Sequence, residues 1–219
     1  MRSWRCNRIA ADGTITPVAT IDTPTSQVAT FNNNGSLLQV GTGLGVQLWD
    51  VGVPEHPVLV STIPTDALPA ASWFAPRSPL IATGTDSGRI TVWDISNPRQ
   101  PKEVRHFTDA RSGIYAVTFS PDEKTLMSGG GDEVYFGWDL TSQRTDATFI
   151  LQPRMGRTTE TRFILDGTAF VGAGEDGTVR MWTLDPAASR ASLCTVRGTP
   201  LTAEEWARFL PGITPFDPC

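Results

Sequence analysis

The sequence of 219 residues predicts an all-β protein: an arc of about four and a half repeated units followed by a short helical tail. Three observations support this prediction. Tryptophans recur as Trp49, Trp93, Trp138 and Trp182, in steps of 44, 45 and 44 residues. Each Trp ends a run in which apolar and polar residues alternate, as they do along a half-buried strand. A glycine-rich or acidic turn precedes each run, which favours short antiparallel strands.

Each repeated unit contains four predicted strands. A run ending near Phe, such as "YAVTF", comes first, and a second apolar run, such as "LIATG", leads into the turn before the Trp run. A fourth run, such as "HPVLVSTI", follows the first Trp runs. Four strands repeating at this period are typical of a β-propeller blade. We expect a partial blade at 1–22 (around Trp4), full blades at about 25–64, 68–108 and 112–151, and a last blade at 156–184.

The stretch "GEDG", residues 174–177, contains two adjacent carboxylates that could form a catalytic pair. Hairpin turns also favour Asp and Gly, because these residues cap the local backbone and adopt positive φ. The position of Asp176 is occupied by Ser87 and Asp132 in the preceding units, so the acid does not recur strictly. We therefore interpret this stretch as a hairpin turn.

Composition and cysteine spacing argue against several functions. A net charge of −5 without a basic run disfavours nucleic-acid binding. The chain has no CxxC motif, and His56 and His106 lie outside the repeat phase, so a hydrolase or metal-dependent site has little support. We expect no enzyme activity and no cofactor. Without a signal peptide or an apolar stretch of about 20 residues, we expect a cytoplasmic protein, unless it belongs to a longer membrane-anchored product.

The repeats resemble the WD40-repeat family over roughly residues 1–184. The resemblance implies a propeller of four-stranded blades that acts as a non-catalytic interaction scaffold or sensor module for a protein partner. It also implies that a hydroxyl and an Asp can join the blade Trp in a hydrogen-bonded group. No blade has the family's Gly-His pair, and Ala110 occupies the equivalent place. The residues given a structural role in the blades are Trp49, Trp93, Ser128, Asp132, Trp138, Asp176 and Trp182.

The family's usual contact positions imply candidate partner-binding residues. Tyr and Arg, two of the residue types among them, are enriched at binding hot spots. The alternative that each is an ordinary surface residue stays open. The candidates are Gln27, Asp86, Tyr115, Arg157, Thr159 and Glu175.

The number of blades is smaller than the resemblance implies. An open arc leaves strand edges and apolar faces uncovered. Three explanations stay open: the chain is the C-terminal piece of a longer propeller, the ring closes unusually, or another chain completes it. We expect the isolated chain to be marginally stable or to self-associate.

Residues 185–219 predict a helical C-terminal cap. Thr202 and Glu205 have the spacing of a capping box, and Leu201 and Trp206 that of a hydrophobic staple. We expect this helix to pack on the last blade, and the alternative is a docking helix for a partner.

The tail resembles the C-terminal end of large bacterial WD40 proteins, in which the propeller is often the sensor of a STAND-type ATPase or a Ser/Thr kinase. The alternative function is therefore a truncated remnant, or a sensor part of such a protein, without independent activity. The chain contains no P-loop or kinase motif. The matching residues include Cys194, Thr202, Trp206 and Cys219.

Cys194 and Cys219 bracket the predicted helix. A helix of about 10 residues is about 15 Å long, and the extended segment after it can return most of that distance. The two sulfurs could form a disulfide bond, although two buried thiols are expected in a reducing cytoplasm.

Overall fold

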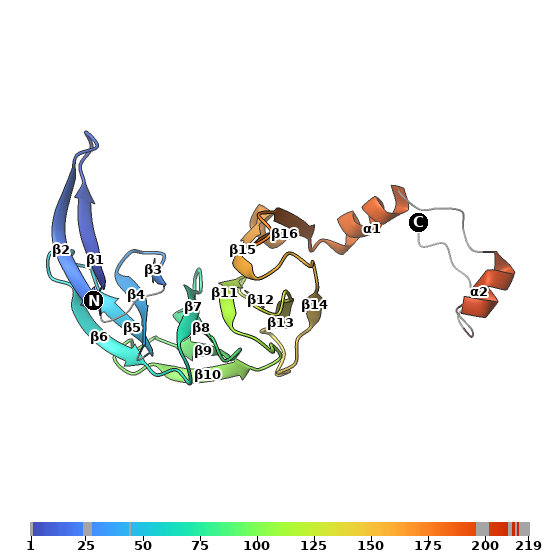
Figure 1. Cartoon of the computed structure of the whole chain (residues 1–219), viewed down its shortest axis with the longest axis horizontal. Helices are drawn as coiled ribbons and strands as arrows, with labels where there is room; N and C mark the ends of the chain where they lie inside the picture. The colour runs from blue at the N-terminus through green and yellow to red at the C-terminus, as the bar shows by residue number, and fades with distance from the viewer. Residues whose placement is uncertain are drawn as a thin grey trace.

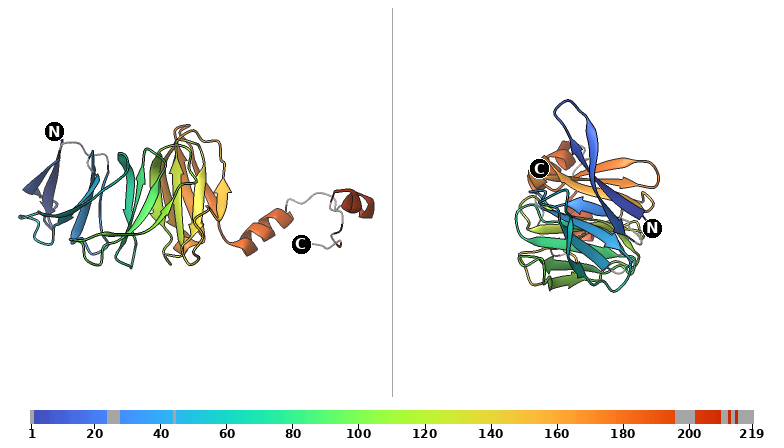
Figure 2. Two further views of the ribbon diagram at one scale, coloured as in Figure 1. Left: turned by 90° about the horizontal axis from the view of Figure 1, so that it is seen from below. Right: turned by 90° about the vertical axis from the view of Figure 1, so that its left-hand side faces the viewer.

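The computed structural model describes residues 2–23, 28–43, 45–195 and 202–209, together with 212 and 214. Within these residues, five antiparallel sheets follow one another along an open arc (Figure 1). Two short helices lie beyond the last sheet (Figure 2). The predicted fold class, an all-β arc of propeller blades with a helical tail, is confirmed.

A two-stranded hairpin forms the first end of the arc (Figure 1). Its strands are β1 (Arg2–Ile9) and β2 (Ile15–Thr23). The turn between them contains Asp12, whose carboxylate accepts the N–H of Thr14 at 2.9 Å. Ile21 is fully buried, which anchors the hairpin against the next sheet.

Three four-stranded sheets form the middle of the arc, and their strands run in chain order from the concave to the outer side (Figure 1). The first contains β3 (Ala29–Phe31), β4 (Leu37–Thr42), β5 (Gly45–Asp50) and β6 (Val58–Ile63). The second contains β7 (Pro69–Phe74), β8 (Leu80–Thr85), β9 (Ile90–Asp94) and β10 (Lys102–Phe107). The third contains β11 (Ile114–Phe119), β12 (Thr125–Gly130), β13 (Tyr135–Asp139) and β14 (Phe149–Leu151).

The last sheet has three strands in the described residues. These are β15 (Thr158–Ile164), β16 (Ala169–Gly174) and β17 (Val179–Thr183), with the short 3₁₀ helix η1 (Leu165–Gly167) between the first two. After β17 the chain continues as the helix α1 (Pro186–Thr195), followed by α2 (Ala203–Phe209).

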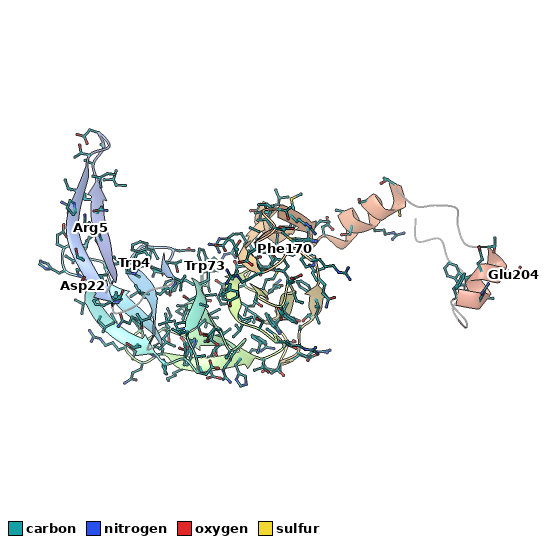
Figure 3. The ribbon with its side chains drawn as sticks, in the orientation of Figure 1. Trp4, Arg5, Asp22, Trp73, Phe170 and Glu204 are labelled. Carbon is teal, nitrogen blue, oxygen red and sulfur yellow. The ribbon has the colours of Figure 1, made fainter. Side chains whose placement is uncertain are left out.

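The apolar core lies between consecutive sheets rather than inside any one of them. Leu48 of the first four-stranded sheet packs with Ile81 of the second, and Phe107 packs in one cluster with Phe119 of the third. Each sheet therefore depends on its neighbours to cover its apolar faces. Phe170, labelled in Figure 3, belongs to the cluster that joins the third and last sheets.

The recurring tryptophans all lie on the third strand of their sheets, but the N–H groups have different acceptors. Nε1 of Trp49 donates to Oε1 of Gln47 at 3.2 Å, and Nε1 of Trp93 donates to Oγ1 of Thr83 at 3.0 Å. Trp182, on β17, stacks on Phe170 with 4.8 Å between ring centroids.

The hydrogen-bonded group implied for Trp138 differs from what the structure shows. Nε1 of Trp138 donates to Oδ2 of Asp109 at 2.8 Å, so the indole is joined to neither Ser128 nor Asp132. The Ser128 hydroxyl is buried and has no hydrogen-bond partner in the described part of the chain. Asp132 accepts the backbone N–H of Arg111 at 3.1 Å instead. The reason is that the segment before β11 brings a carboxylate to the Trp138 N–H.

The stretch "GEDG" forms the turn between β16 and β17. Oδ1 of Asp176 accepts the backbone N–H of Thr178 at 2.9 Å and its hydroxyl at 2.7 Å, and Gly177 has a φ of 78°. These bonds to Thr178 lower the pKa of Asp176. The carboxylate of Asp176 therefore caps a turn, as the sequence interpretation predicts.

The helix α2 has the reciprocal bonds of a capping box. Oγ1 of Thr202 accepts the N–H of Glu205 at 3.2 Å, and the carboxylate of Glu205 accepts the N–H of Thr202 at 2.9 Å. Trp206 is half-buried, and Leu201 lies outside the described residues. The expected packing of α2 on the last blade is not found, because α2 lies away from the sheets (Figures 1 and 2) and has no fully buried residue.

The predicted bond between Cys194 and Cys219 is only partly within the described residues. Cys194 takes part in a disulfide bond, whereas Cys6 is a free thiol. Cys219 lies outside the described residues, so the pairing of these two cysteines stays a prediction.

Candidate partner-binding surface

Three of the candidate residues form one contact group, here called the rim cluster: Tyr115, Arg157 and Glu175. The guanidinium carbon of Arg157 lies 4.8 Å from the centroid of the Tyr115 ring, which is a cation–π contact. Nη2 of Arg157 lies 2.5 Å from Oε1 of Glu175. The cluster thus joins an aromatic ring, a cation and a carboxylate at one edge of the arc.

The local backbone explains why these side chains meet. Arg157 precedes β15, and Glu175 follows β16, its hairpin partner. The backbone N–H of Glu175 donates to the carbonyl of Arg157 at 3.0 Å, so the two residues are held opposite each other. Tyr115 is the second residue of β11, the innermost strand of the neighbouring sheet.

Asp86 lies beside the rim cluster, and a glycine makes this approach possible. A Cβ atom added to Gly113 would lie 3.0 Å from both the Tyr115 hydroxyl and the Cα of Asp86. Gly113 therefore leaves room for the Tyr115 hydroxyl close to the backbone of Asp86. The Asp86 side chain is exposed.

The electrostatics of the rim cluster keep Arg157 charged. Its hydrogen bond with Glu175, followed by that with Tyr115, raises the pKa of the Arg157 guanidinium. The side chains of Arg157 and Glu175 are 47% and 49% exposed, so solvent screens the pair and it contributes little to stability. Both charges are therefore accessible to a partner, and little folding energy depends on their contact.

Two other predicted candidates do not belong to this group. The hydroxyl of Thr159 donates to the carbonyl of Ala173 at 3.2 Å, and no contact in the described part of the chain joins it to the rim cluster. Gln27 lies outside the described residues.

A cleft of about 450 Å³ lies on the concave side of the arc, next to the rim cluster. Its walls come from the innermost strands β3, β7, β11 and β15 and from Trp4 of β1, and Tyr115 belongs both to these walls and to the rim cluster. Trp4 and Trp73 are labelled on the concave side in Figure 3.

Two charged residues line this cleft, and the sequence analysis did not single them out. The guanidinium carbon of Arg162 on β15 lies 3.5 Å from the centroid of the Trp73 ring on β7. Nη1 of Arg162 lies 3.1 Å from Oε1 of Glu160. Only the alternation of β15, which places 160 and 162 on one face, could have indicated that they lie together.

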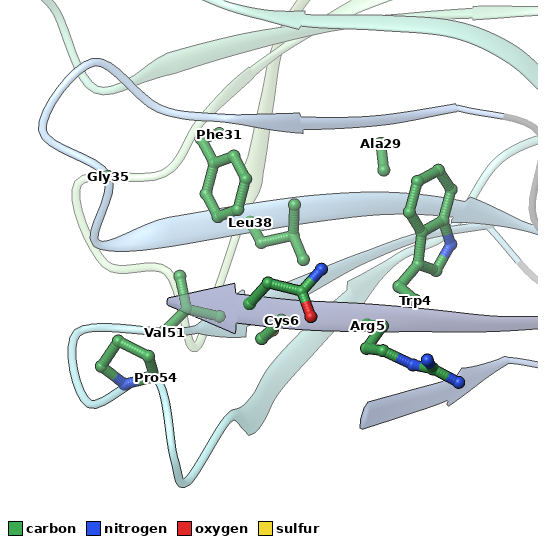
Figure 4. A pocket seen from close by; sticks show the side chains of 10 residues that line it. Trp4, Arg5, Cys6, Ala29, Phe31, Gly35, Leu38, Val51 and Pro54 are labelled. Carbon is green, nitrogen blue, oxygen red and sulfur yellow. The ribbon is translucent and has the colours of Figure 1, made fainter. Parts of the chain in front are cut away.

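A second cleft, of about 410 Å³, lies between the first hairpin and the sheet of β3–β6. Figure 4 shows the side chains of Trp4, Cys6, Phe31 and Leu38 around it. Its lining is mainly apolar and contains a single ionisable group with a permanent charge, Arg5. The rim cluster is richer in groups that can recognise a partner.

The described residues contain no group of three or more His, Cys, Asp or Glu side chains that could hold a metal ion. None of the described helices is long and apolar enough to cross a membrane.

Comparisons with known proteins agree with the repeated architecture. The family described as "WD domain, G-beta repeat" matches residues 101–139. The chain is 26% identical over 172 residues to the protein LST8 homolog of Drosophila melanogaster. The aligned region covers 75% of this chain and 53% of that protein. The chain is also 27% identical over 180 residues to the protein groucho of Drosophila melanogaster. This aligned region covers 78% of this chain and 22% of that protein.

A third relative is the GATOR2 complex protein WDR24 of Danio rerio, with 26% identity over 136 residues. That match covers 61% of this chain and 17% of the relative. The chain thus spans about half of the LST8 homolog and about a fifth of the other two proteins.

Proposed function

Because the chain belongs to the WD40-repeat family, we propose that it is a non-catalytic module that binds a protein partner through the rim cluster and the adjoining cleft. The observation that carries this proposal is the contact of Tyr115 with Arg157 beside a cleft of about 450 Å³. Tyr and Arg in a concave, partly apolar setting are the residue types that dominate binding hot spots.

The arrangement suits a partner that combines an acidic and an apolar group. A partner carboxylate can exchange with Glu175 on the accessible Arg157, which costs little because the pair is exposed. An apolar or aromatic side chain can enter the cleft beside Trp73 and Tyr115. The rigid sheets hold these groups in place before the partner arrives, which reduces the entropy lost on binding.

The test is affinity capture from a lysate of the native host, with matched variants as bait. We expect at least one protein to be enriched by the wild-type chain and lost with Tyr115→Ala and with Arg157→Ala. The control is Arg144→Ala, because Arg144 also forms an exposed ion pair, with Asp146, at a site away from the concave side. Retention of every captured protein by both rim-cluster variants would refute the proposal for this surface.

A further inference from the structure

The strand β17 is an edge strand in a position where the other blades have a neighbour. In the three four-stranded sheets, the Trp strand is paired with a fourth strand: β6 on β5, β10 on β9 and β14 on β13. After β17 the chain instead continues as α1. Within the described residues, the outer edge of β17 therefore has no strand on it.

The hydrogen bonds of the last sheet show which backbone groups point to this free edge. The N–H of Leu184 donates to the carbonyl of Thr168, and the N–H of Gly174 donates to the carbonyl of Thr178. Because the direction alternates along an antiparallel strand, residues 178, 180, 182 and 184 direct their backbone groups toward β16. Val179, Met181 and Thr183 direct theirs outward.

The equivalent residue of the preceding blade supports this assignment. Gly137 occupies the position of Met181, and its carbonyl accepts the N–H of Thr148, which lies beside the fourth strand β14. The outward groups of β17 are thus the ones that would bind an additional strand.

The side chains of β17 leave this edge unprotected. Val179 and Met181 are 71% and 63% exposed, although α1 contacts the strand. The single charge on β17, Arg180, lies on the other face, where it donates to the carbonyl of Pro153 at 2.6 Å and lies 3.5 Å from Asp176. Exposed edge strands are normally protected by charges or Pro, and an edge without them pairs with another strand.

We propose that β17 pairs antiparallel with β17 of a second copy of the chain, with the two-fold axis at Met181. Met181 then faces its own counterpart, Val179 faces Thr183, and Arg180 faces Trp182. Each of the pairs formed by outward residues exchanges two backbone hydrogen bonds. The two three-stranded sheets become one continuous sheet across a self-complementary interface.

The charge of Arg180 disfavours the neighbouring register in which the two-fold axis lies at Arg180. A two-fold axis at Arg180 would place two guanidinium groups opposite each other, which is unfavourable across a strand pair. It would also leave Thr183 without a facing residue of β17 and remove hydrogen bonds. This dimer is separate from the rim cluster, so it goes beyond the proposed function and does not depend on it.

The experiment measures the mass of the full chain by sedimentation over a range of concentrations. We expect a monomer–dimer equilibrium in which Met181→Lys raises the dissociation constant by about tenfold or more, because it places like charges opposite each other. The matched control is Val104→Lys, which changes another exposed apolar residue on an outermost strand, β10, and leaves the equilibrium unchanged.

A charge-swap mixture tests the register itself. An equimolar mixture of Met181→Lys and Met181→Glu should form a heterodimer, since residue 181 faces residue 181. Circular dichroism and thermal unfolding at low concentration establish that each variant is folded.

Four outcomes would overturn the proposal. These are a wild-type chain that stays monomeric up to about 100 µM, where micromolar dimers are populated; growth beyond the dimer, which indicates head-to-tail contacts; equal dissociation by Val104→Lys; and a charge-swap mixture that stays monomeric.

Discussion

Replacing Asp109 with alanine tests the hydrogen bond that the structure places at the Trp138 indole. Trp138 is 1% exposed, and its Nε1 donates to Oδ2 of Asp109 at 2.8 Å. Oδ1 of Asp109 accepts the backbone N–H of Ala147 at 3.3 Å. The substitution removes both acceptors and leaves a buried indole N–H without a partner.

The magnitude follows from the kind of bond that is lost. A hydrogen bond to a charged group contributes about 1.5–3 kcal/mol, and Asp109 is half-buried, so solvent weakens the bond. We expect Asp109→Ala to lower the free energy of unfolding by about 1–2 kcal/mol. In a chain of this size, such a loss lowers Tm by about 2–8 °C.

A double-mutant cycle isolates this bond, because Trp138→Phe removes the donor but keeps an aromatic ring in the stack with Phe107. In the Trp138→Phe background, we expect Asp109→Ala to cost about 0.5 kcal/mol or less. Urea unfolding at one fixed protein concentration measures all four proteins, since association changes apparent stability. The control is Asp146→Ala, which removes an exposed ion-pair partner and should leave the free energy of unfolding nearly unchanged. A coupling energy near zero would refute the role of Asp109.

Three further predictions follow from contacts in the blades. Gly172→Ala should lower the urea midpoint and cost about 1–3 kcal/mol, because the added Cβ would lie 2.0 Å from the Tyr135 hydroxyl; an unchanged midpoint would contradict this contact. Thr83→Val should cost about 1–2 kcal/mol in the same assay by removing the acceptor of the Trp93 N–H, and a neutral result would show that this bond does not stabilise the blade. In the folded protein, the hydroxyl of Ser120 and then the backbone N–H of Lys124 lower the pKa of the Asp122 carboxyl below 3.8. The stability that the Asp122 carboxylate contributes is therefore present above about pH 4 and is lost as the pH falls through the folded-state pKa. Asp122→Asn should reduce the loss of unfolding free energy in that acid range, measured by urea unfolding at a series of pH values, and an unchanged pH profile would contradict this.

Part of the candidate site was accessible from the sequence because the resemblance to the WD40-repeat family implies where contact residues lie. Tyr115, Arg157 and Glu175 were singled out as contact positions, and the structure brings them into one contact group. Their role in binding stays a prediction. The stacking of Arg162 on Trp73 was not found, because it joins sheets that are not neighbours and depends on the curvature of the arc.

The acceptor of the Trp138 N–H also could not be predicted from the sequence, although it lies in the same part of the chain. The resemblance implied a role for Ser128 and Asp132, which lie at family positions, but the indole N–H donates to Asp109 instead. The path of the segment before β11 decides this, and no residue pattern encodes that path directly. The predicted packing of α2 on the last blade was wrong, because an apolar helix face indicates that a surface can be buried but not which surface covers it.

The sequence by itself determined the all-β fold class, the strand that carries each Trp and the turn at Asp176, because periodicity and turn chemistry are local properties of the chain. Tertiary structure decided which polar groups meet across sheets and which edge of the last sheet has no partner strand within the described residues. These features depend on distances between segments that are far apart in sequence. The twist and packing of whole sheets set those distances, since each sheet covers its apolar faces only with its neighbours.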